Sequence, residues 1–152
     1  MAQHKLLKHL HQEHQEVKSI LRKLVKASES DRQQWLDQLR ENLVPHMEAE
    51  EKHIYPALRQ QGGEVKETAL EGIEEHSAAK YVCKQLFEVG TSDETFKAKA
   101  QVLMELIQHH IQEEESEIFD DIEDSFSAQE LDNMFSKFEQ EEQSQKKKAK
   151  AA

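Results

Sequence analysis

The sequence predicts an all-α protein, an antiparallel up-down-up-down four-helix bundle with a short fifth helix at its C-terminal end. The 152 residues are enough for one domain with a single core. The chain has only 4 glycines and 2 prolines, too few turn-forming residues for a sandwich of many strands. Apolar residues also recur every three or four positions over long stretches, which is the period of an amphipathic helix.

Apolar periodicity marks the first two helices. The first stripe covers residues 6–25 and breaks in the polar segment "ASES". Ser30, at the end of that segment, can cap the next helix, whose stripe continues until "QQGG". Pro45 lies inside this second helix and removes a backbone hydrogen bond, so we expect a kink or a local widening over residues 41–45.

Three more helices follow. A third stripe spans residues 64–89, and a fourth spans residues 96–122. Ser127 and Glu130 have the spacing of a capping box, and they begin a shorter fifth helix over residues 131–138. Four long helices joined by short connections pack best as an antiparallel bundle, with their apolar stripes around one interior.

The last stretch of the chain, "EEQSQKKKAKAA", is polar, contains a lysine cluster and carries no apolar stripe. We therefore expect one bundle domain over residues 1–140 and a disordered lysine-rich tail over residues 141–152. Such a tail would contribute nothing to the core.

Charge and cysteine content limit the partners and the compartment. The formal net charge is -11, which disfavours nucleic acid and anionic membrane surfaces as partners, because both bind basic patches. Cys83 is the single cysteine, so no disulfide can form within the chain. The chain shows neither a secretory signal nor an apolar run of membrane-spanning length. A cytoplasmic protein is the simplest expectation.

Six polar residues lie on the apolar stripes, where side chains are expected to be buried. Removing an unpaired carboxylate or imidazolium from water costs on the order of several kcal/mol, so the six must satisfy one another or bind something. A metal is the simplest partner, because histidine and glutamate are common metal ligands. The six are His14, His46, Glu50, His76, His110 and Glu114.

An internal repeat strengthens this interpretation. A lone histidine is followed about thirty residues later by His-x-x-x-Glu-Glu, first as "HMEAEEKHIY" and again as "HIQEEESEIF". Side chains four residues apart lie on one face of a helix, so each pair of histidine and glutamate can hold a common centre. Two copies predict a pseudo-twofold site for two metal ions that share both glutamates as bridges. Imidazole with bridging carboxylate suits iron, manganese or zinc.

Several histidines leave alternatives open. His109 with Glu113 has the same spacing as the second pair, but the stripe and the repeat both favour His110. His11 and His53 each lie one turn from a proposed ligand and stay open as additional ligands. Any one of these patterns alone is more often a core histidine or a chance match on an acidic helix, whereas their combination favours the site.

Glu51 and Glu115 directly follow the two proposed bridges. Histidine ligands usually donate their second ring nitrogen to a carboxylate or a carbonyl, so these two glutamates can orient them. An acidic face in contact with water explains them equally well. Cys83, two turns after His76, is most simply a small apolar core residue.

These motifs resemble the hemerythrin-like family, named for its His-His-Glu cation-binding pattern. The resemblance covers about residues 6–138 and rests on "HQEV" at His14, "HMEAEEKHIYP", "EEHSAAK" at His76 and "HIQEEESEIF". It implies a non-haem di-iron centre with a bridging oxo, hydroxo or water, in which manganese or zinc could substitute. The metal ligands that it implies are His14, His46, Glu50, His76, His110 and Glu114, with the two glutamates as bridges.

The resemblance also implies a function. A carboxylate-bridged iron pair would bind dioxygen, as a carrier, a store or a sensor with a separate partner. The alternatives are a di-iron oxidoreductase that acts on peroxide or nitric oxide, and a protein that stores or donates iron. Binding is favoured over catalysis, because no general acid or base beyond the glutamates is evident. A metal-free interaction module would leave six buried polar groups unexplained.

One position departs from the oxygen carriers of the family. They place another histidine one turn before the residue aligned with His76, and here that position is Gly72. Either one iron has a vacant or water-filled position, or a nearby residue such as His11 or Glu75 reaches it. An open position would favour peroxide or nitric oxide chemistry over reversible oxygenation.

Overall fold

The computed structural model describes residues 2–151, and helices make up nearly all of that range. The four long helices are α1 (Lys5–Lys26), α2 (Arg32–His53), α4 (Gly63–Val89) and α5 (Phe96–Glu113). The other elements are the 3-10 turn η1 (Glu29–Asp31), α3 (Tyr55–Arg59), the π-helical turn η2 (Glu114–Ile118), α6 (Phe119–Ser125) and α7 (Ala128–Ala151). Residues 2–151 contain no strand, which confirms the all-α prediction. Across the same residues, no helix is long and apolar enough to cross a membrane.

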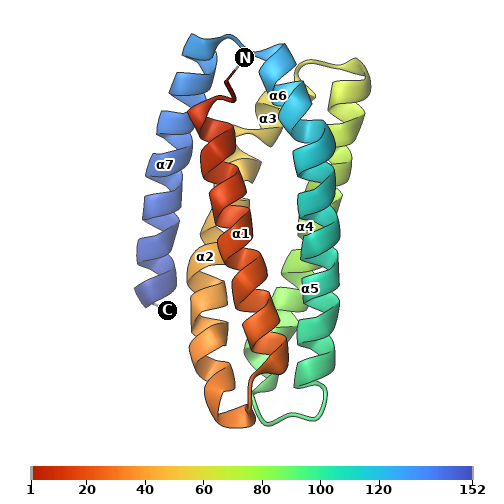
Figure 1. Cartoon of the computed structure of the whole chain (residues 1–152), viewed down its shortest axis with the longest axis vertical. Helices are drawn as coiled ribbons and strands as arrows, with labels where there is room; N and C mark the ends of the chain where they lie inside the picture. The colour runs from red at the N-terminus through yellow and green to blue at the C-terminus, as the bar shows by residue number, and fades with distance from the viewer. Residues whose placement is uncertain (1, 152) are drawn as a thin grey trace.

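The four long helices run alternately up and down and lie side by side (Figure 1). α1 packs against both α2 and α5, and α4 packs against α5. This arrangement is consistent with the predicted antiparallel bundle. α7 packs along α2, on the side of the molecule away from α4 and α5 (Figure 1).

The C-terminal helix is longer than the sequence predicts. A short helix over residues 131–138 and a disordered tail from residue 141 were expected, whereas α7 continues as one helix to Ala151. Phe138 is buried on the face that packs inward, and Glu142 continues that face one turn later. The buried face therefore extends beyond its last apolar residue through a charged side chain, which an apolar pattern does not register.

Helix capping and helix distortion follow the sequence only in part. Ser127 and Glu130 form the predicted capping box: the Ser127 N–H donates to the Glu130 carboxylate at 2.7 Å, and the Glu130 N–H donates to Ser127 Oγ at 3.2 Å. α2 remains α-helical across Pro45, so no wide turn forms at residues 41–45. Non-α geometry occurs instead at Ile54, which separates α2 from α3, and in η2.

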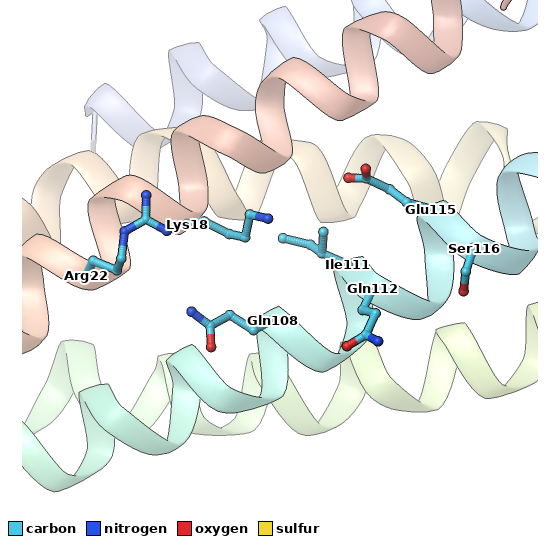
Figure 2. A pocket seen from close by; sticks show the side chains of 7 residues that line it. All are labelled: Lys18, Arg22, Gln108, Ile111, Gln112, Glu115 and Ser116. Carbon is cyan, nitrogen blue, oxygen red and sulfur yellow. The ribbon is translucent and has the colours of Figure 1, made fainter.

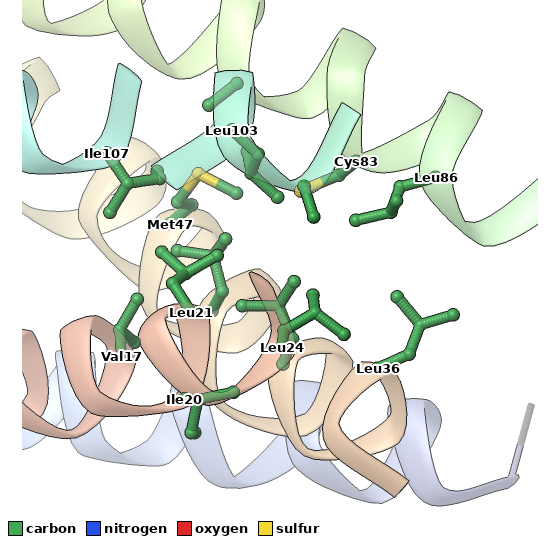
Figure 3. Packing of buried hydrophobic residues seen from close by; sticks show 14 of the residues in the cluster. Val17, Ile20, Leu21, Leu24, Leu36, Met47, Cys83, Leu86, Leu103 and Ile107 are labelled. Carbon is green, nitrogen blue, oxygen red and sulfur yellow. The ribbon is translucent and has the colours of Figure 1, made fainter. Parts of the chain in front are cut away.

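Two apolar clusters fill the interior. In the first, side chains of α1, α2, α4 and α5 interlock (Figure 3), among them Val17, Leu21, Met47, Cys83 and Ile107. The second lies at the end where α3 and α6 cover the long helices, and includes Leu10, Ile54, Tyr55, Phe119, Ile122 and Phe138. Each fully buried leucine or isoleucine contributes about 1.5 to 3 kcal/mol. Along α1, the predicted ligand His14 lies between the two clusters.

Candidate metal centre

The structure brings the six predicted side chains to one place. None of them is more than 5 % exposed. Their ligand-capable atoms form two overlapping groups, and the atoms within each group lie within 4.8 Å of one another. Both groups contain Glu50 of α2 and Glu114 of η2; one adds His14 of α1 and His46 of α2, and the other adds His76 of α4 and His110 of α5.

The Nε2 atoms of the four histidines face the two shared carboxylates. The distances from Nε2 to the nearest carboxylate oxygen are 2.5 Å for His46 to Glu50, 2.9 Å for His110 to Glu114, 3.4 Å for His14 to Glu114 and 3.3 Å for His76 to Glu50. Each carboxylate therefore reaches a histidine of both groups. A ligand that bridges two ions requires this arrangement.

The Nδ1 atoms on the outer side of the four rings face a second layer of carboxylates. The pairs are His14 with Glu115 at 2.7 Å, His46 with Glu13 at 3.0 Å, His76 with Glu51 at 3.5 Å and His110 with Glu75 at 2.8 Å. A carboxylate that accepts from Nδ1–H fixes the ring orientation and leaves Nε2 free to bind a cation. In each pair the two residues come from different helical elements.

Sequence reasoning anticipated only half of this outer layer. Glu51 and Glu115 have the orienting position for which the sequence offered two explanations. Glu13 and Glu75 were not predicted in this position, because each immediately precedes one site histidine in sequence yet contacts a different one in space. A signal was present, since both copies of the repeat place a glutamate directly before the lone histidine.

The charges of the site compensate one another. Burial lowers the pKa of His14, but the close contacts with the carboxylates of Glu114 and Glu115 outweigh burial and raise that pKa to about 10. Hydrogen bonds to Glu114 and Glu75 likewise overcome burial and raise the pKa of His110 to about 10. Without a metal, the interior therefore holds imidazolium and carboxylate ions. Metal binding would replace those imidazolium protons with a cation.

Several buried atoms of the site lack a hydrogen-bond partner. They include His14 Nε2 and both carboxylate oxygens of Glu50, whose close contacts do not have hydrogen-bond geometry. An unsatisfied buried polar group costs about 1 to 3 kcal/mol. A cation bonded to these atoms would satisfy them, and imidazole nitrogen with carboxylate oxygen suits iron, manganese or zinc. The residues present therefore fit a metal centre.

Tyr55 fills the space beside Gly72. A Cβ atom on Gly72 would lie 2.9 Å from Tyr55 Cε1 and 3.0 Å from its hydroxyl oxygen. The hydroxyl donates a hydrogen bond to Glu114 Oε2 at 2.6 Å. Burial and the charge of Glu114 raise the pKa of Tyr55 far above its ordinary value, so the phenol stays protonated. The space is thus not open, and neither His11 nor Glu75 reaches it, since both contact other partners.

The role of Tyr55 was missed, although the repeat contains a signal for it. Tyr55 and Phe119 are the final residues of the two repeated motifs. The Tyr55 ring packs edge-on against His76 at 5.2 Å between centroids, and the Phe119 ring stacks on His14 at 6.1 Å. The two aromatic residues thus differ by one hydroxyl and by the orientation of the ring against the histidine. A buried tyrosine hydroxyl usually has a hydrogen-bond partner, and the nearest polar groups on the predicted interior are those of the centre. This need for a partner is the signal in the sequence.

The remaining candidate histidines lie outside the centre. His11 and His53 each face a glutamate near the surface, at 2.6 Å and 3.5 Å respectively. The His109 ring is 62 % exposed and lies 3.1 Å from glutamates of α4 and α5. The structure thus places His110, and not its neighbour, among the six.

Both copies of the repeat leave α-helical geometry just after the shared glutamate. In the first copy, the Ile54 N–H still donates to the carbonyl of Glu50 at 2.9 Å, but the backbone of Ile54 departs from the helix, with φ −113° and ψ −59°, and the chain then turns into α3. In the second copy, the N–H of Phe119 donates to the carbonyl of Glu114, five residues back, which makes the wide turn of η2. Such π-turns are frequent at functional sites. Here Glu114 faces the centre while its neighbour, Glu115, reaches α1.

A small cavity lies beside the histidines. Its volume is about 10 Å³, and its walls are the four histidine rings and the apolar side chains of Val17, Leu43, Met47, Ile107 and Ile111. This space accommodates about one water-sized molecule. The centre therefore has an apolar compartment on the side of the first apolar cluster.

A groove of about 550 Å³ lies outside this cavity, between α1 and α5 (Figure 2). Polar side chains line it, with Lys18 and Arg22 on α1 and Gln108 and Gln112 on α5. Ile111 contributes to the walls of both the groove and the cavity. Ile111 therefore lies between the cavity and the groove.

Comparison with known proteins places this geometry in a family. The hemerythrin HHE cation binding domain matches residues 5–122, which include all six side chains of the centre. A similar protein is the "DNA nickase" of Nostoc sp. (strain PCC 7120 / SAG 25.82 / UTEX 2576), 26 % identical over 127 residues. The similarity covers 83 % of this chain and 36 % of the Nostoc protein, so the chain spans about a third of that relative. No solved structure shows a significant match. The chain belongs to the hemerythrin HHE cation-binding domain family.

Proposed function

We propose that the chain is a non-haem di-iron protein that binds dioxygen reversibly, as a carrier, a store or a sensor. The observation that carries this proposal is the cavity of about 10 Å³ beside four histidines that converge on two shared carboxylates. The cavity accommodates about one water-sized molecule, which limits the ligand to a very small one, and its apolar walls favour an uncharged ligand.

The six central residues divide into two sets of ligands. His14 and His46 would hold one ion, and His76 and His110 the other, with Glu50 and Glu114 as bridges. A bridging oxo, hydroxo or water would complete the pair. Ferrous iron supplies the redox chemistry that reversible dioxygen binding requires, whereas zinc fits similar ligands but has none.

The surrounding residues keep the centre ready and dry. Outer carboxylates bond to Nδ1 of His14, His46 and His110, which directs Nε2 of these rings inward, and Glu51 lies 3.5 Å from Nδ1 of His76. Tyr55 donates to Glu114 and so fixes the orientation of that carboxylate. Apolar walls such as Ile107 and Ile111 exclude water from the cavity, which would slow irreversible oxidation.

Peroxide or nitric oxide reduction and iron storage are the alternatives. The sequence supported the first of these through an open position at Gly72, and the Tyr55 ring fills that space. The filled position favours reversible binding over turnover, and the oxidoreductase becomes one outcome of the test below.

We do not extend the nickase activity of the Nostoc protein to this chain. The two align over 36 % of that protein, and a net charge of -11 opposes binding to DNA phosphates. We expect the iron-loaded chain to leave supercoiled plasmid intact. Nicking that is lost in His46→Ala would contradict this expectation.

The test is anaerobic loading with ferrous iron, followed by visible spectroscopy as oxygen is admitted and then removed. We expect an absorption band that appears with oxygen and disappears without it. Glu50→Gln and His46→Ala should abolish the band, and the matched change His53→Ala, on the same helix outside the centre, should leave it. Irreversible oxidation with rapid consumption of peroxide would support the enzyme instead. Iron binding unchanged in Glu50→Gln and His46→Ala would reject the centre.

A further inference from the structure

A second cluster of histidine and carboxylates lies where α7 meets α1. His9 Nε2 is 3.3 Å from Glu13 Oε1 and 3.3 Å from Glu142 Oε1. One ligand-capable atom from each of the three residues lies within 4.8 Å of the other two. His9 and Glu13 are one turn apart on α1, whereas Glu142 comes from α7, which begins after the last residue that matches the family.

Burial leaves a carboxylate oxygen of this cluster without a partner. Glu142 is only 4 % exposed, and its Oε2 atom is buried and accepts no hydrogen bond. Burial raises the pKa of Glu142 to about 7, and the hydrogen bond with His9 offsets this effect only in part because Glu13 lies close by. Two buried carboxylates thus lie side by side, and the positive charge between them is that of His9, whose pKa its hydrogen bonds to Glu13 and Glu142 raise to about 10.

The nearest lysine supplies little of that charge. Lys146 Nζ lies 4.0 Å from Glu13 Oε2, at the limit of an ion pair, and its side chain is 38 % exposed. A divalent cation among the three residues would displace the His9 proton to solvent, neutralise both carboxylates and satisfy Glu142 Oε2. One imidazole with two carboxylates suits a divalent first-row transition-metal ion. The His9 side chain is 28 % exposed, so an ion from solvent can reach it.

We infer that His9, Glu13 and Glu142 form a third cation site, which takes a divalent first-row transition-metal ion and lies between solvent and the central pair. Glu13 Oε1 also lies 3.0 Å from His46 Nδ1. An ion in the third site would therefore share a carboxylate that orients a ligand of the centre. This link to the centre rests on the proposed function, whereas ion binding at the third site does not.

Equilibrium dialysis of the full chain against Co²⁺, with metal analysis, tests the site. The wild type should bind one ion per chain more than Glu142→Gln or His9→Gln. Both changes remove a ligand while nearly keeping side-chain size. Glu139→Gln makes the same chemical change at an exposed position of α7 and should bind as many ions as the wild type.

A variant of the centre separates the two proposals. Glu50→Gln combined with Glu114→Gln should lose the central ions and keep one ion, which a further Glu142→Gln removes. Equal ion counts and affinities in the wild type and Glu142→Gln would overturn the third site. Loss of every ion together with loss of helical circular dichroism in Glu142→Gln would also overturn it, because the role of Glu142 would then be to stabilise the fold and not to bind an ion.

Discussion

Gly72 makes room for an aromatic ring from α3. Tyr55 is almost fully buried, and its hydroxyl donates to Glu114 at 2.6 Å. A Cβ atom at residue 72 would overlap the ring, because it would lie 2.9 Å from Tyr55 Cε1. Glycine inside a helix normally costs about 1 kcal/mol relative to alanine. Here the glycine leaves room for the Tyr55 ring, and the hydroxyl of that ring can then donate to Glu114, a carboxylate that both groups of the centre share.

Gly72→Ala should therefore destabilise the protein, by about 1 to 3 kcal/mol from overpacking. At an ordinary helical position the same change would stabilise by up to about 1 kcal/mol. Denaturant unfolding of the metal-free protein measures the difference. In a Tyr55→Leu background the change should instead stabilise by up to about 1 kcal/mol, because the ring is gone and the helical preference of alanine remains. Stabilisation by Gly72→Ala in the wild-type background would contradict the overlap.

Ile111→Val should open the wall between the groove and the cavity. The change removes one methylene, so stability should fall by only about 0.5 to 1.5 kcal/mol. We expect the ferrous-loaded protein to oxidise faster in air, because water and oxygen reach the centre more easily. Stopped-flow absorbance gives the rate, and Ile107→Val is the matched control, since Ile107 lines the cavity but not the groove. Equal acceleration in both variants would argue against a gate at Ile111.

Residue patterns predicted the inner part of the candidate site better than the outer part. The six central side chains fall on the buried faces of their own helices, so helical periodicity alone brings them inward. Glu13 and Glu75 each serve a histidine of another helix, and Tyr55 reaches across to Glu114. Such contacts depend on how helices are placed against one another, which spacing along one helix does not encode.

At the scale of the helix, the length of α7 is what apolar periodicity predicted wrongly. Its buried positions are Leu131, Met134, Phe138 and Glu142, and the last of these is charged. The stripe continues geometrically while the apolar pattern ends. The turn of η2 is a similar case, because a π-turn leaves no mark in the apolar period of a short, acidic segment. The long helices were predictable because many apolar residues define each one.

Removal of residues 141–152 discriminates between a disordered tail and a packed helix end. Truncation of a disordered tail would leave stability unchanged. The structure predicts a loss of about 1 to 3 kcal/mol, because the truncation removes Glu142, one of the two buried carboxylates that His9 contacts. Thermal unfolding of the full and truncated chains measures it. A truncated chain that unfolds at the same temperature would show that the helix end contributes nothing.

For the molecule as a whole, the buried ion pairs predict how stability depends on pH without metal. The folded-state pKa values of His14 and His110 are raised to about 10 by their glutamate partners, which overcome burial. Their contribution is fully present below the unfolded value of about 6.5 and is lost as pH rises toward 10. Melting temperatures of the metal-free protein should therefore fall between pH 7 and pH 9. A rise over that range would contradict these pairings.

The acidic limit has the opposite sign. Burial and the charge of Glu50 act to raise the pKa of Glu114, but hydrogen bonds from His110 and His14 lower it to about 2. Its contribution is present above the unfolded value of about 4.3 and is lost as pH falls toward 2. Its protonation therefore limits the stability of the fold at acidic pH.

Metal binding has a different pH dependence. It needs neutral imidazole, so ion affinity should rise with pH over the range in which the metal-free protein becomes less stable. Because the bound ion displaces imidazolium protons, a pH-stat should detect proton release when Zn²⁺ is added at pH 7.

The central residues also divide the apolar interior into two parts, one on either side of a polar layer. Without ions, the groups of that layer are held together by histidine–glutamate ion pairs, which depend on the protonation of the histidines. Each part could then open separately, as cooperative units of different stability do in other proteins. Ions bound to four helices at mid-height would tie the two parts together. Metal loading would thus set whether the chain unfolds in one step or in two, in addition to raising its melting temperature.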